Sequence, residues 1–513
     1  MKKIITLIII VGTAVMSIAQ NVGIGTITPI AGLHILSNNG IIAKGDTLSN
    51  NPYVLTETGA GAKLIWHPKK AAFMVGRLDN FGDVPNRWDE DSVGFGAMNL
   101  GYANKVKGQY SFATGIGNIV SSGGFGSIAM GHNSFADSNE CVAIGFSARA
   151  LQRQAIAIGT GVVANGRSSF ATGYLSYAGG YVSTAGGAYS KAEGDYSFSN
   201  GFYTSAKGEH SFSQGYGNYS GAKHSFTAGI EDSVFEFTSP YEGARSAVAF
   251  GWRNKVRGAF SVAAGSFNNI DSAGYNSFVM GFGNRASNNE AFALGNSNTA
   301  SGKASIAFGT GSSSTGDYSI AMGYSNSAYG KNSVAFGTGT STYGDYSLAF
   351  GNNSSTTATA QYSVALGKDA QATCMNCIVM GSPLNNETNV GIGISDPSHA
   401  RLEIKNTIGA AVAMFGSDKY GVTIQADNPE VGFNYFYNGG SKTIKAGYAG
   451  VIGMNPGSGE IYIGNFNGNQ SGADFGSITG YRQNLSLFQN GEFRIAGTSN
   501  FTHFMFGSNE DTY

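Results

Sequence analysis

The sequence predicts an all-β protein whose centre is a parallel β-coil of 14-residue repeats, followed by a second β-rich module. Three observations predict this class. Glycine recurs at a fixed interval, the residues before these glycines alternate between small and bulky apolar side chains, and helical spacing is absent. The 513 residues include 77 glycines, yet 12% are aromatic, which is more than a disordered low-complexity chain carries.

Residues 1–19 have the features of a cleaved secretory signal peptide. Lys2 and Lys3 precede an apolar run, and Ser17 and Ala19 supply the small residues that a cleavage site requires. The run is short for a spanning helix, and no later stretch is long and apolar enough to span a bilayer as a helix. We therefore expect a mature chain without a direct membrane span that is secreted, extracellular or located on the outer-membrane surface.

Two copies of the pentapeptide NVGIG mark the starts of two β modules. They occupy residues 21–25 and 389–393, and each copy continues to a proline and then to Leu-x-Ile at the start of a strand. We expect an N-terminal β module over residues 20–75 and a C-terminal β-rich fibre module over residues 389–513. In the second module, LSLFQNGEFRIA predicts a hairpin with Asn490 and Gly491 at its turn.

Residues 76–388 are expected to form the coil. The phrase small-apolar-Ala-apolar-Gly closes on twenty glycines from Gly96 to Gly381, and fourteen of the nineteen intervals between them are 14 residues. A further glycine lies seven residues before many of these closing glycines. Each repeat is therefore predicted to contain two short strands and two tight turns in which glycine allows the chain to reverse.

Both faces of the longer predicted strand are apolar. In SVAFG, Val334 and Phe336 lie on one face, and Ala335 lies on the other. A narrow coil buries only its inner face, and an exposed row of bulky side chains would be a larger apolar patch than monomers carry. We therefore expect an obligate oligomer with one face inside the coil and the other in a subunit interface. The sequence leaves open which face takes which place.

The repeat resembles the head of YadA-type trimeric adhesins, which is built on N-S-V-A-I-G-x-x-S-x-A-x-G. The chain carries it as NSVAFGTGTSTYG from Asn332 and as YSVALGKDAQA from Tyr362. This resemblance implies a left-handed parallel β-roll, three chains around one axis and an adhesive role. The chain differs from that family in having no heptad stalk and no four-strand C-terminal anchor, so self-anchored autotransport is not expected.

The flanking modules resemble a different group. The NVGIG phrase, and GAGAKLIWHPKKAAFMVG before the first repeats, are similar to segments of secreted fibre proteins of Bacteroidota. Those segments are in turn similar to phage tail fibres. The resemblance implies a fibre protein in which the YadA-like repeats are one module.

Two insertions interrupt the period and contain the candidate ligand contacts. The first, RLDNFGDVPNRWDEDS, includes Trp88 and Asp89. The second, IEDSVFEFTSPYEGARS, lengthens the interval from Gly229 to Gly251 to 22 residues. Its candidates are Glu231, Asp232, Phe235, Phe237 and Tyr241. Insertions in a solenoid protrude on one face, which is often the binding face. The alternatives are loops without a function and caps on the end of the coil.

Three cysteines are few for an exported protein. Cys374 and Cys377 are the candidate disulfide, within one chain or between chains; alternatively, Cys377 and Cys141 simply occupy the small serine position of the repeat. Zinc is not expected because third and fourth ligands are not nearby. The sequence has no spacing typical of a nucleophile, an acid–base set or a phosphate loop, so we expect no catalytic, cofactor or metal site.

The predicted function is attachment. A net charge of −1 without basic runs gives no reason to expect nucleic acid as a partner. The sequence favours a secreted or cell-surface homotrimeric adhesin that binds a host, matrix or surface protein or a glycan by multivalent display on a rigid β-roll. The alternatives are a receptor-binding tail fibre of a phage or contractile injection apparatus, and a structural surface-layer rod. The signal peptide argues against the tail fibre, because such fibres assemble in the cytoplasm.

Overall fold

The computed structural model describes residues 22–24, 33–35, 60–80, 87–235, 245–382, 390–392, 394, 402–404, 411–416, 421–425, 430–437, 441–443, 449–466, 481–488, 493–495 and 502–504. The chain divides into two compact units, Met1–Ser297 and Asn298–Tyr513, and both contain turns of the repeat. The architecture is all-β, a parallel β-solenoid of about twenty turns, which confirms the predicted parallel coil.

The first unit begins with two pairs of strands. β1 (Val22–Ile24) and β2 (Leu33–Ile35) pair in parallel, so the first NVGIG contributes a strand. β3 (Gly61–His67) and β4 (Ala72–Leu78) form an antiparallel hairpin around the 3-10 turn η1 (Pro68–Lys70).

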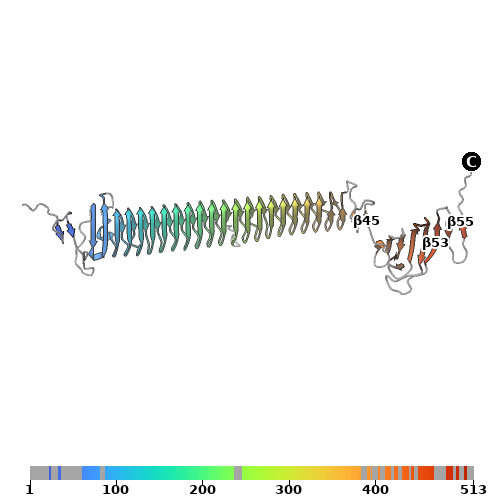
Figure 1. Cartoon of the computed structure of the whole chain (residues 1–513), viewed down its shortest axis with the longest axis horizontal. Helices are drawn as coiled ribbons and strands as arrows, with labels where there is room; N and C mark the ends of the chain where they lie inside the picture. The colour runs from blue at the N-terminus through green and yellow to red at the C-terminus, as the bar shows by residue number, and fades with distance from the viewer. Residues whose placement is uncertain are drawn as a thin grey trace, which may run out of the picture. The chain divides into compact units, whose positions relative to one another are not determined.

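The solenoid starts at β4, which also pairs in parallel with β5 (Met98–Tyr102) and lies with Gly76 beside Gly101. The long strands that follow in this unit are β7 (Phe112–Ile116), β9 (Ile128–His132), β11 (Val142–Phe146), β13 (Ile156–Thr160), β15 (Phe170–Tyr174), β17 (Thr184–Ala188), β19 (Phe198–Phe202), β21 (Phe212–Tyr216), β23 (Phe226–Ile230), β25 (Val248–Trp252), β27 (Val262–Ser266), β29 (Phe278–Phe282) and β31 (Phe292–Asn296). They form a regular ladder in Figure 1, from blue through green to yellow.

Each turn also contributes one short strand to a second parallel sheet. In the first unit these are β6 (Lys105–Val106), β8 (Ile119–Val120), β10 (Phe135–Ala136), β12 (Arg149–Ala150), β14 (Val163–Ala164), β16 (Tyr177–Ala178), β18 (Lys191–Ala192), β20 (Ser205–Ala206), β22 (Tyr219–Ser220), β24 (Ser233–Val234), β26 (Lys255–Val256), β28 (Asn269–Ile270) and β30 (Arg285–Ala286). Pairing is in register, so equivalent residues of successive turns lie side by side.

The second unit continues the same pattern. Its long strands are β33 (Ile306–Thr310), β35 (Ile320–Tyr324), β37 (Val334–Thr338), β39 (Leu348–Asn352), β41 (Val364–Leu366) and β43 (Ile378–Met380). Its short strands are β32 (Thr299–Ala300), β34 (Ser313–Ser314), β36 (Ser327–Ala328), β38 (Ser341–Thr342), β40 (Ser355–Thr356) and β42 (Gln371–Ala372).

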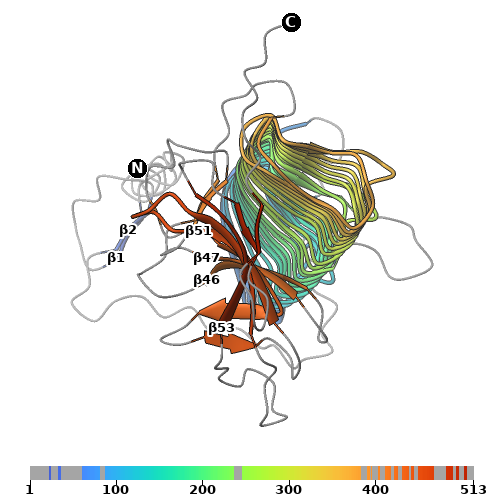
Figure 2. The same ribbon diagram turned by 90° about the vertical axis from the view of Figure 1, so that its right-hand side faces the viewer.

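Mostly small side chains fill the interior of the turns, with valine or isoleucine in some of them, such as Val256 and Ile270. Ala143 and Ala157 of the long strands are fully buried side by side, and so are Ala150 and Ala164 of the short strands. Mainly small apolar and hydroxyl groups therefore separate the two sheets. Figure 2 shows the successive turns of the solenoid stacked one behind another. The bulky side chains, such as Ile158, lie on the outer face. This arrangement resolves the open assignment of faces within one chain, because alanine faces inward.

The closing glycines are required by backbone conformation and by space. Gly145 has a φ of 137°, and a Cβ added to it would lie 2.0 Å from the carbonyl oxygen of Gly159. The row begins with Gly76 beside Gly101 and continues with Gly101 beside Gly115. Gly96, which the spacing placed in this row, lies before β5 with a φ of 67° and is not part of it.

A buried ladder of mainly polar side chains supports the turns after the long strands, although Ala148, Val162 and Ala370 take this position in three turns. Asn118 donates from Nδ2 to the carbonyl oxygens of Thr114 at 2.9 Å and Gly131 at 2.8 Å. Its Oδ1 accepts from the backbone N–H of Ser134 at 2.9 Å. Each amide therefore satisfies groups of its own turn and of the next, as a buried polar side chain must.

An antiparallel sheet follows in the second unit. After the parallel pair β44 (Val390–Ile392) and β45 (Leu402–Ile404), eight strands form it in the order β46 (Ala411–Gly416), β47 (Gly421–Gln425), β48 (Glu430–Phe433), β51 (Ala449–Met454), β52 (Ile461–Phe466), β53 (Tyr481–Leu487), β54 (Phe493–Ile495) and β55 (Thr502–Phe504). β49 (Tyr435–Tyr437) and β50 (Ser441–Thr443) form a separate pair. The expected Asn490–Gly491 turn lies outside the described residues, between the paired strands β53 and β54.

Candidate ligand-binding site

The first predicted ligand segment folds onto the start of the solenoid. Trp88 is fully buried, and its Nε1–H donates to the carbonyl oxygen of Asn104 at 3.1 Å. Asp89 is half-buried just before the 3-10 turn η3 (Glu90–Ser92). Trp88 therefore cannot contact a ligand from solution, because its side chain is packed against the first turns as a cap would be.

The second predicted segment begins in the turn after β23. Glu231 has a φ of 54° and forms an ion pair with Arg253 of the next turn, which raises the pKa of the Arg253 guanidinium. Phe235 follows β24 and lies under the guanidinium of Arg257, whose Cζ is 4.8 Å from the ring centroid. Phe237 and Tyr241 lie outside the described residues, so their roles remain predictions.

Asp232 occupies a place in the buried polar ladder and does not reach the outer surface. Its Oδ1 accepts from the backbone N–H of Asn254 at 2.8 Å and from Asn254 Nδ2 at 2.9 Å. Its Oδ2 is buried without a hydrogen-bond partner among the described residues. Burial raises the pKa of the Asp232 carboxyl, against the hydrogen bonds from Asn254 that lower it. The prediction that Asp232 contacts a ligand is therefore corrected: it is an interior residue.

A groove of about 660 Å³ lies beside this segment. Its lining includes Glu231, three cations and the polar residue Asn269; the cations are Arg253, Lys255 and Arg257. Lys255 and Arg257 project outward from β26 and its end, because the intervening Val256 is fully buried.

Aromatic rings lie against both arginines of the groove, and an amide also holds Arg257. Arg253 Cζ lies 5.7 Å from the Trp252 ring centroid and 5.8 Å from that of Phe267. Arg257 Nη1 donates to Asn269 Oδ1 at 3.4 Å, in addition to its position over Phe235. Cation–π contacts of this kind orient a guanidinium and leave its other N–H groups available.

Sequence reasoning missed these three cations. They belong to RNKVRG, residues 253–258, in the ordinary repeat that follows the insertion. The prediction considered only residues of the insertion and therefore did not include them. The sequence pattern that could have identified them is the alternation of cations with other residues. Cations occupy positions 253, 255 and 257, and the residues between them, Asn254 and Val256, are buried. The insertion therefore indicated the part of the solenoid that contains the groove, but most of the residues that line the groove lie outside the insertion.

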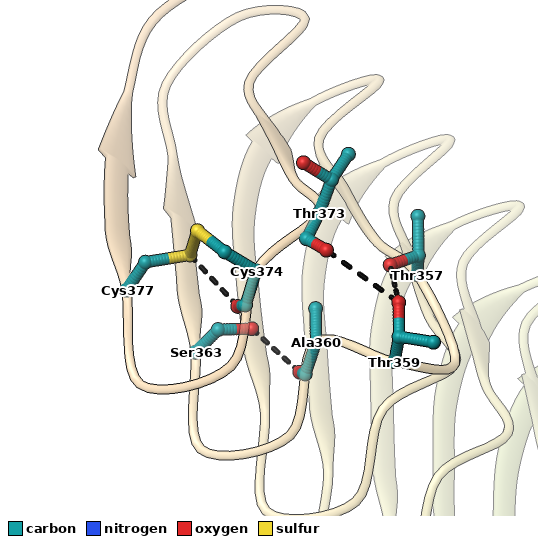
Figure 3. Close-up of a disulfide and its surroundings, with 7 residues drawn as sticks. All are labelled: Thr357, Thr359, Ala360, Ser363, Thr373, Cys374 and Cys377. Atoms are coloured by element: carbon teal, nitrogen blue, oxygen red, sulfur yellow. Dashed lines mark hydrogen bonds between the residues drawn. A yellow bond between two sulfur atoms is a disulfide. The ribbon is translucent and has the colours of Figure 1, made fainter.

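Cys374 and Cys377 form a disulfide across the turn before β43. Figure 3 shows it one turn after Ala360 and Ser363, where the Ser363 hydroxyl donates to the Ala360 carbonyl oxygen at 2.6 Å. The disulfide thus spans the same turn as the serine bond does in the preceding repeat. Cys141 is a free buried thiol in the same serine row, and burial raises its pKa.

No group of three or more His, Cys, Asp or Glu side chains with metal-binding proximity occurs among the described residues. Within the same ranges, no helix has the length and hydropathy of a membrane span.

Comparison with known proteins gives two similarities. Residues 142–161, 300–326, 328–354 and 355–373 match the family model described as the YadA head domain repeat. The crystal structure of the collagen-binding domain of the Yersinia adhesin YadA is 20% identical over 38% of this chain and 79% of that chain, with a TM-score of 0.18. No curated protein matches the chain. The chain therefore contains segments similar to YadA head repeats within a parallel β-solenoid.

Proposed function

We propose that the protein is a secreted or cell-surface adhesin that acts as a homotrimer and attaches through ligands bound on its outer surface. The observation that carries this proposal is the apolar outer face of the long strands. Phe336 and Phe350 are 38% and 43% exposed, and their rings stack at 4.8 Å. In the first unit, Phe198, Phe212 and Phe226 form a similar ladder with centroids 4.9 and 4.8 Å apart.

A second copy of the chain is the natural occupant of this face. Every turn places an equivalent outward residue at the same position, so the face has the fixed period of the solenoid. Another chain has the same period and the same apolar row, and such self-complementarity is what closed homo-oligomers use. An apolar face of this extent is larger than monomers leave in water. Three copies are favoured by the similarity to the YadA head repeat.

The antiparallel sheet of the second unit supports self-association independently. Val431, Ile452 and Ile463 are paired across neighbouring strands, and all three are exposed on one face. Met454 and Ile461 continue this face. The opposite face contains the buried residues Val451 and Phe466, as well as other residues of the sheet.

Attachment is assigned to the outer face of the short strands, where polar and charged side chains predominate. Three chains would present each surface site three times on a stiff support, and multivalency strengthens binding without strong single contacts. A host, matrix or surface protein or a glycan is the expected ligand.

The test combines mass and attachment. The mature chain, residues 20–513, is purified, its mass is measured by light scattering, and its binding is measured on glycan and matrix-protein arrays. We expect three times the chain mass and binding that weakens sharply when the assembly is dissociated. A monodisperse monomer, or a trimer that binds nothing on cells and arrays, would contradict the proposal.

A further inference from the structure

The groove beside β26 points to a class of ligand. We propose that Arg253, Lys255 and Arg257 bind the carboxylate or sulfate groups of an acidic polysaccharide. This inference rests on the proposed attachment function and names the ligand class for one surface of the adhesin.

The first argument is placement. Arg253 lies in the turn after β25, and Lys255 and Arg257 follow at alternate positions, so the three side chains lie along one stretch of outer surface. All three line a single hollow of about 660 Å³. The lining includes one carboxylate, Glu231, which pairs with Arg253. Cations therefore outnumber it, and a hollow with an excess of positive charge concentrates oppositely charged ligands.

The second argument is charge balance. Glu231 pairs with Arg253, and Asp271 of the next turn is bound instead by Arg285, with Nη2 at 2.6 Å from Oδ2. Among the described residues, no carboxylate forms an ion pair with Lys255 or Arg257. The groove therefore keeps two cations without an anionic partner in that part of the chain.

The third argument is that the donors are already oriented. Arg257 is fixed by the Phe235 ring and by Asn269, whose Nδ2 in turn donates to Asp271 Oδ1 at 2.6 Å. A guanidinium has five N–H donors in a planar fork that matches a carboxylate or sulfate. Because its orientation is set before binding, less conformational entropy is lost when the ligand arrives.

A polysaccharide fits this surface better than a peptide. Peptides commonly bind sheets by adding a strand to unpaired backbone groups. Here the backbone is paired from turn to turn: the N–H of Phe235 donates to Val256 at 2.9 Å, and that of Arg257 donates to Ile270 at 3.0 Å. Recognition must then come from side chains, and charged groups with amides and exposed rings suit the acidic groups, hydroxyls and ring faces of a sugar polymer.

The experiment compares two double variants of the mature chain. Lys255→Gln with Arg257→Gln removes the two unpaired cations of the groove. Lys105→Gln with Lys107→Gln is the matched control, because these residues hold the same two outward positions on β6, outside this groove. Immobilised chains are titrated with heparin, polygalacturonate, neutral dextran and polyglutamate at low and high salt, and thermal melting checks that each variant folds.

We expect heparin or polygalacturonate to bind the natural sequence and the control equally, and the groove variant about tenfold or more weakly, as the loss of charge-assisted hydrogen bonds predicts. Arg257→Lys alone should bind at intermediate strength, because it keeps the charge without the fork. Binding should weaken with salt. Dextran should not bind.

Two results would overturn the inference. One is the absence of acidic-polysaccharide binding, or an equal loss in both double variants. The other is polyglutamate binding that is as tight and as dependent on the groove, which would assign the site to acidic peptides. If the chain is trimeric and still attaches to cells in either case, the proposed function survives and only the ligand class fails. A monomeric chain without attachment would instead remove the proposed function.

Discussion

The two outer faces of the solenoid carry similar aromatic ladders in opposite surroundings. On the long strands, Phe336 and Phe350 stack at 4.8 Å. On the short-strand side, Tyr329 and Tyr343 stack at 4.7 Å and follow strands that present serine outward. Stacking comes from the repeat itself, because equivalent residues of neighbouring turns must lie side by side. Stacking alone therefore does not identify an interface; the apolar character of the whole row does.

The interior explains how the faces can differ. Ala335 and Ala349 are buried behind the long strands, and Ala328 and Thr342 are buried behind the short ones. Because the inner residues are mostly small, with valine or isoleucine in some turns, they keep the backbone regular while the outward positions vary. One 14-residue frame thus supports an apolar face suited to self-association and a polar face suited to ligands.

Charging the apolar ladder should have the largest effect. Phe336→Glu with Phe350→Glu would place two carboxylates in the proposed subunit interface, where unpaired buried charges cost several kcal/mol each. We expect dissociation to monomers, measured as mass by light scattering.

The short-strand side provides the matched control for this change. Tyr329→Glu with Tyr343→Glu breaks an equivalent stack in the same unit, and the mass of the assembly should not change. If the tyrosine variant dissociates and the phenylalanine variant does not, the assignment of the two faces is reversed.

The corner glycines should show the next largest effect. Gly337 has a φ of 131°, and an added Cβ would lie 1.8 Å from the Gly351 oxygen. Gly337→Ala should lower the free energy of unfolding by about 3–5 kcal/mol, the sum of backbone strain and overpacking. Denaturant unfolding at fixed protein concentration measures the loss.

Gly330 at the short-strand corner is the comparison. An added Cβ there is also close, 2.1 Å from the Gly344 oxygen, but the same row holds alanine at Ala222 and Ala360. The backbone therefore adjusts to a methyl group, and Gly330→Ala should cost only about 1–2 kcal/mol. Equal losses at both corners would show that close contact, and not positive φ, decides the cost.

The fold was predictable because the solenoid is a one-dimensional repeat. Fourteen-residue spacing of the glycines and the small–bulky alternation of SVAFG determine the strands and the tight turns. Which face is inner was not predictable, because alanine and phenylalanine rows are both apolar and the choice depends on how close the two sheets lie. Gly96 was misplaced because the first insertion shifts the frame before Gly101.

The candidate site was harder to predict, because function depends on which way each side chain points. Asp232 belongs to an insertion by sequence, yet its distance from Gly229 is that of the buried ladder, as Asn218 is from Gly215. Trp88 also lies in the interior, because burying the large apolar surface of an indole is favourable. That Lys255 and Arg257 point outward follows from the burial of Val256 between them, which only the structure shows.

Asp232 allows a test of the interior that the outer faces do not influence. In other turns the ladder amide donates to carbonyl oxygens, as Asn218 Nδ2 does to Gly229 at 2.9 Å, and an ionised carboxylate has no proton to donate. Asp232→Asn should raise the free energy of unfolding at neutral pH by about 1–2 kcal/mol, the cost of one unsatisfied buried group.

The pH dependence follows from the raised pKa of Asp232. The folded chain holds the proton more tightly than the unfolded chain, so this residue's favourable contribution is complete below the ordinary value of 3.8 and is lost as pH rises through the folded pKa. Melting temperatures measured from acid to neutral pH should fall more in the natural sequence than in Asp232→Asn. Asn268→Asp should introduce the same dependence in another turn, and parallel melting curves for all three chains would contradict this account.

Removing the disulfide should have the smallest effect on stability, because in the preceding turn a serine hydrogen bond spans the equivalent residues without a disulfide. Cys374→Ala with Cys377→Ser recreates the Ala360–Ser363 arrangement of the preceding turn. Closing so short a loop contributes about 2 kcal/mol, and the restored serine hydrogen bond returns about 1 kcal/mol. The net loss in unfolding free energy should therefore be about 1 kcal/mol.

The control is Cys374→Ala with Cys377→Ala, which lacks the hydroxyl and should lose about 1 kcal/mol more. If the two variants melt together, the serine row does not stabilise these turns, and the disulfide is an addition to the repeat and not a substitute for one of its bonds.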